Sequence, residues 1–266
     1  MRRVYQDQLR KKRRRKFLLK LLAITGVVFL FLGGVIYLLF FAGLLDVRTI
    51  DIKGAEVISS ADLKTTAESW LKGGFWGLTR SRNLLFFSAD DLAGELAGKF
   101  PRIDSVEVKK EFPHRLKINI TERQSAGIWC FVADNRCFYF DKDGIAYAEA
   151  AQSSGFLILN VADYRGQAVA LGSRVDSQGW IKNIITAREL LLKTGISAAE
   201  FAIPSGSFDE FDAKTAEGWK IFFSNSTDIT KQISSLAVLL RDKLPAEKRK
   251  GLEYFDLRIQ DRIYYR

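Results

Sequence analysis

The sequence predicts an α+β protein. It should have a single transmembrane helix, then a β-α-α-β-β domain, then a mixed, mainly antiparallel β domain with two helices. A charge-free apolar stretch near the N-terminus is long enough to cross a bilayer as a helix. Beyond it, short runs of alternating apolar and polar residues indicate strands, and apolar residues spaced three and four apart indicate helices.

Residues 1–20 form a basic tail. They hold ten Lys or Arg residues and one acid, Asp7, so they account for +9 of the formal net charge of +10. The other 246 residues are close to neutral, which argues against a nucleic-acid-binding surface on a folded domain. Beside a membrane, such a tail sets topology and contacts anionic lipid. We therefore expect a cytoplasmic tail and no nucleic-acid partner.

Residues 21–45 are predicted to be the transmembrane helix, because Leu21 to Leu45 is a run of 25 residues without a charge. Basic residues flanking a first span stay in the cytoplasm, so residues 46–266 should lie outside it. The alternative is a cleaved signal peptide. That reading requires a shorter apolar core and small residues before the cut, whereas Phe40-Phe41-Ala42 is bulky there. We expect a retained anchor in the cytoplasmic (inner) membrane.

Residues 46–124 are predicted to form the first domain. Val47–Lys53 alternates as a strand that ends at Gly54. Serines 59 and 60 cap one helix and Ser88 caps another, with a loop over 73–83 between them. Pro101 ends the second helix. Two alternating strands then follow, over 103–112 and 116–122, joined at Pro113-His114.

Residues 125–266 are predicted to form the second domain, in which strands outnumber helices. The expected strands lie in FLILNV, AVAL, EFAIP, SFDEFDA, GWKIFFS, LEYFDLRI and RIYYR. One amphipathic helix should run from Gln178 to Thr194 and stop at Gly195. A second should be capped by Thr227 and end before Pro245.

Three segments of the first 150 residues resemble the POTRA domain of the bacterial cell-division family FtsQ/DivIB. They are VRTIDIKGAEVISSADL, FPRIDSVEVKKEFPHRLKINITER and FDKDGIAYAEA. Pro101, Pro113 and the Glu122-Arg123 pair stand where that family has a Pro before a strand, a strand–Pro–strand hairpin and a closing Glu-Arg. FDLRIQDRIYYR is similar to the last strands of the family's β domain. With the basic tail and single span, the resemblance covers nearly the whole chain; the cysteine pair departs from it.

The resemblance implies a non-enzymatic scaffold of the divisome at the division septum. It would recruit small coiled-coil partners, FtsB/DivIC-like and FtsL-like, through the C-terminal β region, and help to position septal wall synthesis. POTRA modules also occur in outer-membrane insertases. The alternative is therefore a POTRA-bearing component of a protein export or outer-membrane assembly machinery, although no long series of barrel strands follows here.

The two cysteines, Cys130 and Cys137, lie in two β-rich runs around Asp134-Asn135 that indicate a hairpin. A loop at Ala133-Asp134 would place them directly opposite each other, and a loop at Asp134-Asn135 would offset them. An oxidising exterior favours a disulfide, against the alternative of two small buried thiols.

No convincing catalytic or metal site is present in the sequence. The single histidine, His114, follows Pro113 in a predicted turn, where a base for a triad is not expected. Asp141-Lys142-Asp143-Gly144 lacks the later ligands of a calcium loop and is typical of a β-turn. We therefore expect no catalytic residue, no metal, no cofactor and no small-molecule substrate.

The C-terminal stretch carries the candidate binding residues. Phe255, Leu257 and Ile259 fall on one strand face and should be core. A three-residue connection would keep Ile263 and Tyr265 on that same side. An edge strand can accept a strand from another chain, and Tyr and Arg suit interfaces. The predicted partner-binding residues are Arg258, Arg262, Tyr264, Tyr265 and Arg266. The strands Val47–Lys53 and Leu116–Thr121 are a second candidate edge.

Overall fold

The computed structural model describes residues 2–40, 42–72, 82–166, 168–176 and 179–266. These fall into two compact units. The first comprises Met1–Leu96 and Val106–Ile120, and the second comprises Ala97–Ser105 and Thr121–Arg266. Most of the loop predicted over 73–83 lies outside the described residues.

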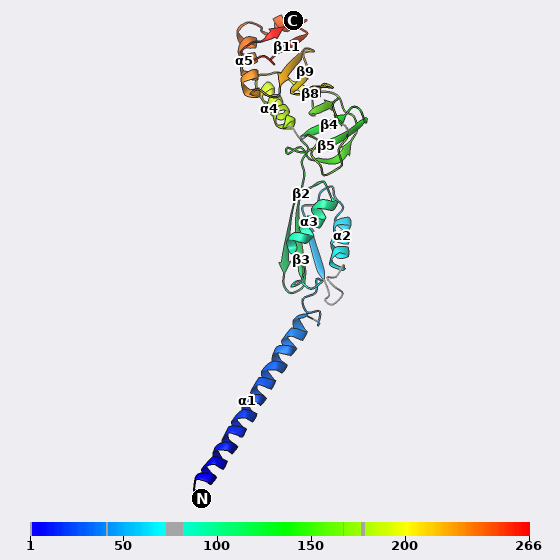
Figure 1. The fold of residues 1–266 in the computed structure, drawn as a ribbon. Coiled ribbons are helices and arrows are strands. Elements are labelled where there is room, and N and C mark those ends of the chain that lie inside the picture. Colours follow the sequence, from blue (N-terminus) through cyan, green and yellow to red (C-terminus); the bar gives the residue numbers. More distant parts are fainter. Residues whose placement is uncertain (1, 41, 73–81, 167, 177–178) are drawn as a thin grey trace. The chain divides into compact units, whose positions relative to one another are not determined.

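Helix α1 (Arg2–Phe40) contains the predicted anchor (Figure 1). Its stretch Lys16–Leu39 has a mean hydropathy of 2.5, is not buried against the protein, and is long and apolar enough to cross a membrane. The predicted span reached Leu45, but the helix ends at Phe40. Gly43 has a φ of 65°, a left-handed conformation that does not continue a helix.

The first unit contains a three-stranded sheet in the order β1-β3-β2. The strands are β1 (Thr49–Lys53), β2 (Ile103–Glu111) and β3 (Arg115–Glu122), and β1 pairs with β3 in parallel. Helices α2 (Ser60–Lys72) and α3 (Ala89–Lys99) lie on one side of it (Figure 1). The buried side chains between helices and sheet are Leu63, Ala67, Leu71, Leu92, Leu96, Leu116, Ile118 and Ile120.

The predicted β-α-α-β-β order is confirmed, but β3 is the central strand. The segment Leu116–Thr121 is therefore not a docking edge, because its backbone groups pair on both sides. Gly54 ends β1 with a φ of 82°. A Cβ at this position would lie 2.0 Å from the Ile120 carbonyl oxygen, so only glycine fits.

The second unit contains a nine-stranded sheet in the order β12-β11-β10-β9-β8-β7-β4-β5-β6. Five of its eight neighbouring pairs are antiparallel and three are parallel, so the predicted mixed, mainly antiparallel sheet is confirmed. The strands are β4 (Gly127–Phe131), β5 (Arg136–Phe140), β6 (Ala146–Ala150), β7 (Asn160–Asp163), β8 (Ala198–Ile203), β9 (Glu210–Thr215), β10 (Lys220–Ser224), β11 (Tyr254–Asp256) and β12 (Tyr264–Tyr265).

Helices α4 (Trp180–Lys193) and α5 (Ile229–Asp242) pack against each other, and a short 3₁₀ turn, η1 (Ala246–Arg249), follows α5. The core of this unit is rich in aromatic side chains, which bury much apolar area each. Those that are fully buried are Trp129, Trp180, Trp219, Phe138, Phe140, Phe201, Phe211, Phe223 and Phe255.

Two predicted strands differ from the structure. Of FLILNV, only Asn160 and Val161 belong to β7, and Leu157 before them is 94% exposed. AVAL (168–171) forms no strand; Val169 packs against the core as irregular chain. Short apolar runs without a clear period do not distinguish a strand from a buried loop.

Candidate partner-binding edge

Strand β12 stands last in the strand order of the large sheet, so one of its sides has no strand neighbour among the described residues. It pairs with β11 through Phe255 opposite Tyr265 and Asp256 opposite Tyr264. Arg266 N–H donates to the Tyr254 carbonyl, and Tyr254 N–H donates to the Arg266 carbonyl, each at 3.3 Å. Because antiparallel pairs alternate, the N–H and C=O of Tyr265 point away from β11. The predicted edge strand therefore offers backbone groups outward.

The connection from β11 to β12 is longer than the three residues that the sequence predicts, since it runs over 257–263. Leu257 is still buried, and its N–H donates to the Phe222 carbonyl at 2.9 Å. Ile259 is 52% exposed, so the prediction that it belongs to the core is wrong. The chain turns here: Asp261 has a φ of 61°, and Arg262 N–H donates to the Ile259 carbonyl at 3.2 Å.

The Arg258 guanidinium is held by its own sheet. It donates from Nε to Asp256 Oδ1 at 2.9 Å and from Nη2 to Asp256 Oδ2 at 2.6 Å. Its Nη1 donates to Glu210 Oε2 at 2.8 Å, and its Cζ lies 5.3 Å from the centre of the Phe222 ring. These hydrogen bonds lower the pKa of Asp256 and raise the pKa of Arg258. Arg258 thus fixes the end of β11 rather than presenting an unengaged cation.

The other predicted binding residues lie on or beside β12 and are exposed. Arg266 pairs with Glu253 through Nε at 3.0 Å and through Nη2, and this pairing raises the pKa of Arg266. Tyr264 is 47% exposed and Tyr265 46% exposed, although the Tyr265 ring lies 5.6 Å from the Phe255 ring. Arg262 is exposed beside them. The structure thus brings Arg262, Tyr264, Tyr265 and Arg266 together along one edge.

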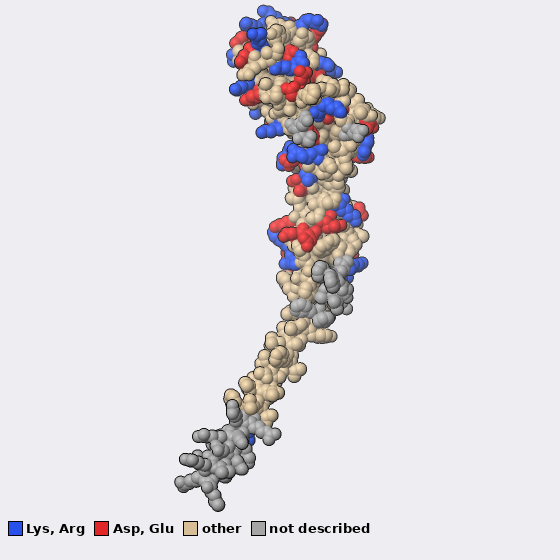
Figure 2. All heavy atoms as spheres, viewed as in Figure 1, with Lys and Arg blue, Asp and Glu red and all other residues tan. Residues whose placement is uncertain are grey.

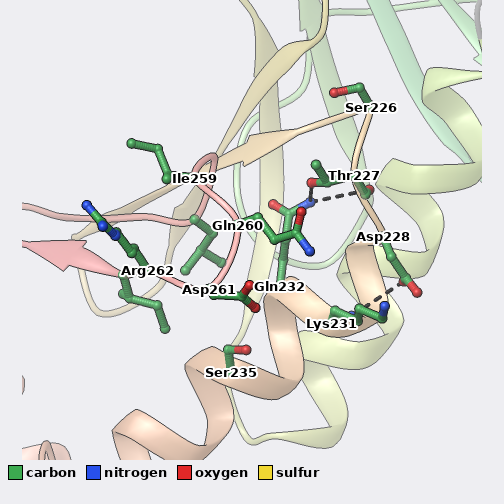
Figure 3. Close-up of a pocket in the computed structure, with 12 residues that line it drawn as sticks. Ser226, Thr227, Asp228, Lys231, Gln232, Ser235, Ile259, Gln260, Asp261 and Arg262 are labelled. Atoms are coloured by element: carbon green, nitrogen blue, oxygen red, sulfur yellow. Dashed lines mark hydrogen bonds between the residues drawn. The ribbon is translucent and has the colours of Figure 1, made fainter.

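A cavity of about 250 Å³ lies between the start of α5 and the 257–263 connection (Figure 3). Its lining is amphipathic, since α5 and the connection both supply polar side chains and the connection also supplies aliphatic ones. The residues that line it are Ser226, Thr227, Asp228, Lys231, Gln232, Ser235, Leu257, Ile259, Gln260, Asp261, Arg262 and Ile263. The groove and the β12 edge are thus continuous through Arg262 and Ile263.

The wall of the groove formed by α5 is fixed by side-chain hydrogen bonds. Asp228, rather than the predicted Thr227, caps the helix by accepting from Thr230 N–H at 2.8 Å. The buried Gln232 accepts from Ser224 N–H at 3.2 Å and donates to the Ser224 carbonyl at 2.9 Å. It also donates to Thr227 Oγ1 at 2.7 Å (Figure 3). Gln232 therefore ties α5 to the end of β10.

Cys130 and Cys137 stand directly opposite each other in the β4–β5 hairpin, in the register that a turn centred on Ala133-Asp134 gives. Their sulfurs are joined in a disulfide, and the Cα atoms are 4.0 Å apart. They are seven residues apart in sequence, so the covalent loop is short.

The polar clusters elsewhere have structural partners. Oxygens of Asp104, Asp141 and Asp143 lie within 4.8 Å of one another. Arg123 pairs with Asp104 at 3.2 Å and also with Asp141, and Lys142 pairs with Asp143 at 2.5 Å, so each of the three carboxylates has a cationic partner. Asp141 Oδ1 accepts from Asp143 N–H at 2.9 Å, as expected of the predicted turn. His114 lies in the β2–β3 turn, where its carbonyl accepts from Arg48 N–H at 2.8 Å.

Sequence reasoning missed three contributors to the edge: Glu210, Gln232 and the exposed Ile259. A lone Gln in an amphipathic helix gives no signal of burial. The Arg258–Glu210 pair joins positions far apart in the chain, which one sequence cannot show. On the face seen in Figure 2, acidic and basic side chains are interspersed over the second unit, so no single-sign patch marks the site.

The fold fits a single-pass membrane protein with a POTRA-type domain: it has an apolar N-terminal helix, a small β-α-α-β-β domain and a mixed-sheet domain. Residues 45–123 match the family described as POTRA domain, FtsQ-type. Over 247 residues the chain is 21% identical to the cell division protein FtsQ of Streptomyces collinus, covering 90% of this chain and 84% of that protein. Both similarities point to the FtsQ/DivIB family of cell-division proteins, so the resemblance seen in the sequence is confirmed.

Proposed function

We propose that this cell-division protein is a non-enzymatic, single-pass scaffold of the divisome. Lys16–Leu39 would span the cytoplasmic membrane, with the basic tail inside the cell and residues 46–266 outside. It would collect at the division septum, recruit FtsB/DivIC-like and FtsL-like partners, and thereby help to position septal wall synthesis. The similarity to the FtsQ of Streptomyces collinus supports the cell-division role.

The observation that supports recruitment is the free side of β12. A partner segment in extended conformation can add to this edge through the N–H and C=O of Tyr265, extending the sheet by one strand. Tyr264 and Tyr265 supply exposed aromatic area on the two faces of that edge, and Arg262 and Arg266 supply charge. Arg258 contributes by attaching the end of β11 to Glu210 on β9.

The test replaces Tyr265 with proline in the full-length protein. Proline removes the outward N–H, but the hydrogen bonds to β11 come from the flanking residues, so the domain should stay folded. We expect capture of an FtsB-like partner from the native cell to fall at least about tenfold, whereas Tyr265→Phe, the matched control, should retain it. Retained capture by the folded proline variant would refute strand addition at β12.

A role in protein export or outer-membrane assembly is the competing function, since POTRA modules also occur there. Depletion separates the two. Filamentous cells and a midcell position of the tagged protein support division, whereas loss of outer-membrane proteins from dividing cells supports transport.

A further inference from the structure

One end of the first unit gathers exposed apolar side chains. This end, here called the tip, consists of residues 44–48, 82–86 and 112–115. Backbone hydrogen bonds join its three segments: Leu84 N–H donates to the Leu45 carbonyl at 2.9 Å, Val47 N–H to the Arg82 carbonyl at 2.8 Å, and Arg48 N–H to the His114 carbonyl at 2.8 Å. The tip is therefore one ordered surface at the start of β1 and β3.

Among the described residues of this unit outside α1, five large apolar side chains are exposed, and four of them lie on the tip: Leu44, Leu85, Phe86 and Phe112. Phe112 is 58% exposed, Leu44 51% and Leu85 46%. The fifth, Val57, follows β1 at the opposite end of the sheet. Apolar side chains that cluster on a surface mark a contact with something other than water.

The chain itself keeps the tip close to the membrane that the anchor would cross. Leu45 follows the last residue of the apolar stretch, Leu39, by six positions, so it lies at most about 22 Å from it even when fully extended. The connecting chain is shorter than that, because Ala42 N–H bonds to the Tyr37 carbonyl and Asp46 N–H to the Gly43 carbonyl. The headgroup layer on one side of a bilayer is itself roughly 5–8 Å thick.

The polar side chains of the tip suit the same surface. Arg48, Arg82 and Arg115 are exposed there. The acids are Glu111, which lies beside the tip 3.7 Å from Arg115, and the half-buried Asp46, so the arginines outnumber them by one. Arginine at this depth pairs with lipid phosphate while apolar neighbours enter the boundary between headgroups and acyl chains. The tip thus combines exposed apolar area with excess positive charge, and a short segment of chain joins it to the predicted membrane span.

We propose that the tip is a second membrane contact. Leu44, Leu85 and Phe112 insert into the headgroup layer of the leaflet from which the chain emerges, and the arginines bind its phosphates. This inference depends on Lys16–Leu39 being a membrane span, but not on β12 binding a partner. The contact would hold the first unit in a fixed orientation on the lipid surface.

The test uses the full-length chain, with its disulfide intact, in phosphatidylethanolamine–phosphatidylglycerol vesicles. A maleimide nitroxide is attached to a cysteine introduced by Phe112→Cys or, as the matched control, Val57→Cys. We expect the ratio of collisions with oxygen to collisions with a water-soluble nickel chelate to be several-fold higher at position 112. An equal, water-like ratio at both positions would overturn the proposal. So would a label at 112 that neither reagent reaches, because protein would then cover the tip.

A second measurement distinguishes insertion from mere proximity. Adding Leu44→Ser and Leu85→Ser should return the label at position 112 to a water-like ratio, while Leu157→Ser in the second unit should leave it unchanged. All three of these side chains are exposed, so the variants should fold, and the near-ultraviolet circular dichroism spectrum checks this. An unchanged ratio in the folded Leu44→Ser, Leu85→Ser variant would overturn the proposal.

Discussion

The Arg258 guanidinium forms a two-pronged hydrogen bond with the Asp256 carboxylate, at 2.9 Å and 2.6 Å, although only one residue separates them in the chain. The backbone N–H of Arg258 also donates to Asp256 Oδ1 at 3.1 Å. These hydrogen bonds between residues two apart hold the chain in a turn directly after β11. The same guanidinium reaches Glu210 on β9, so the turn is attached to the sheet two strands away.

The first prediction concerns this turn. Arg258→Ala should lower the free energy of unfolding by about 1–2 kcal/mol, because it leaves two carboxylates without their charged donor. Urea denaturation measures the change. Arg266→Ala is the control: both side chains of its pair with Glu253 are largely exposed, so its cost should be clearly smaller than that of Arg258→Ala. Equal costs for the two variants would contradict the structural role of Arg258.

The second prediction concerns pH. Burial raises the pKa of Asp212, and Lys220, 3.5 Å away, offsets this only in part. A raised pKa in the folded state means that the native protein holds the proton more tightly than the unfolded chain does. Asp212 therefore lowers the stability of the protein as the pH rises from the pKa of the unfolded state through the pKa of the folded state. Asp212→Asn should remove that loss, so its stability relative to wild type should increase from pH 3.5 to pH 7.

Denaturation of both proteins at the two pH values checks this. A stability relative to wild type that falls from pH 3.5 to pH 7 would show that the Lys220 ion pair outweighs the burial of the charge.

The third prediction concerns the disulfide between Cys130 and Cys137. Closing so short a loop stabilises the folded state by roughly 2–3 kcal/mol through the unfolded chain. Replacing both cysteines by alanine should lower the free energy of unfolding by up to that amount. A reducing agent should lower the Tm of the wild type and leave that of the double variant unchanged. An identical response of both proteins to the reductant would contradict the stabilising role.

The fourth prediction concerns Gln232. Gln232→Leu should cost about 2–3 kcal/mol, because it leaves the N–H and the carbonyl of Ser224 without partners in a buried site. It should also widen the groove beside β12 and weaken partner capture. The neighbouring exposed Lys231→Gln is the matched control and should change stability by less than about 0.5 kcal/mol. Thermal unfolding followed by circular dichroism measures both.

The amphipathic patterns predicted the order of helices and strands well, because period and capping are local properties. Ser59 and Ser88 accept from the N–H groups of Asp62 and Asp91 at the starts of α2 and α3, as predicted. The alternation of Phe255 and Leu257 likewise identified two core residues. The same alternation wrongly predicted that Ile259 is in the core. The strand ends at Asp256 and the chain then turns, and the alternation of apolar and polar residues does not indicate where a strand ends.

Properties that depend on distant segments could not be predicted. The β-rich runs around Ala133 to Asn135 allow two hairpin registers, and only the packed sheet selects the one that pairs Cys130 with Cys137. Strand β11 lies parallel to β10, and the prediction of a mixed, mainly antiparallel sheet does not say which pairs are parallel. The groove combines side chains of α5 with those of the 257–263 connection, and no local pattern indicates that these meet.

The parallel pairing of β10 with β11 has a consequence for how the molecule matures. Parallel neighbours need a crossover, and here the chain makes it through α5, so the place of β11 and β12 in the sheet depends on the segment that contains this helix. If β12 is the docking edge proposed above, a chain in which α5 has not packed would present no ordered edge to a partner. Binding of a partner would then report that the second unit has folded.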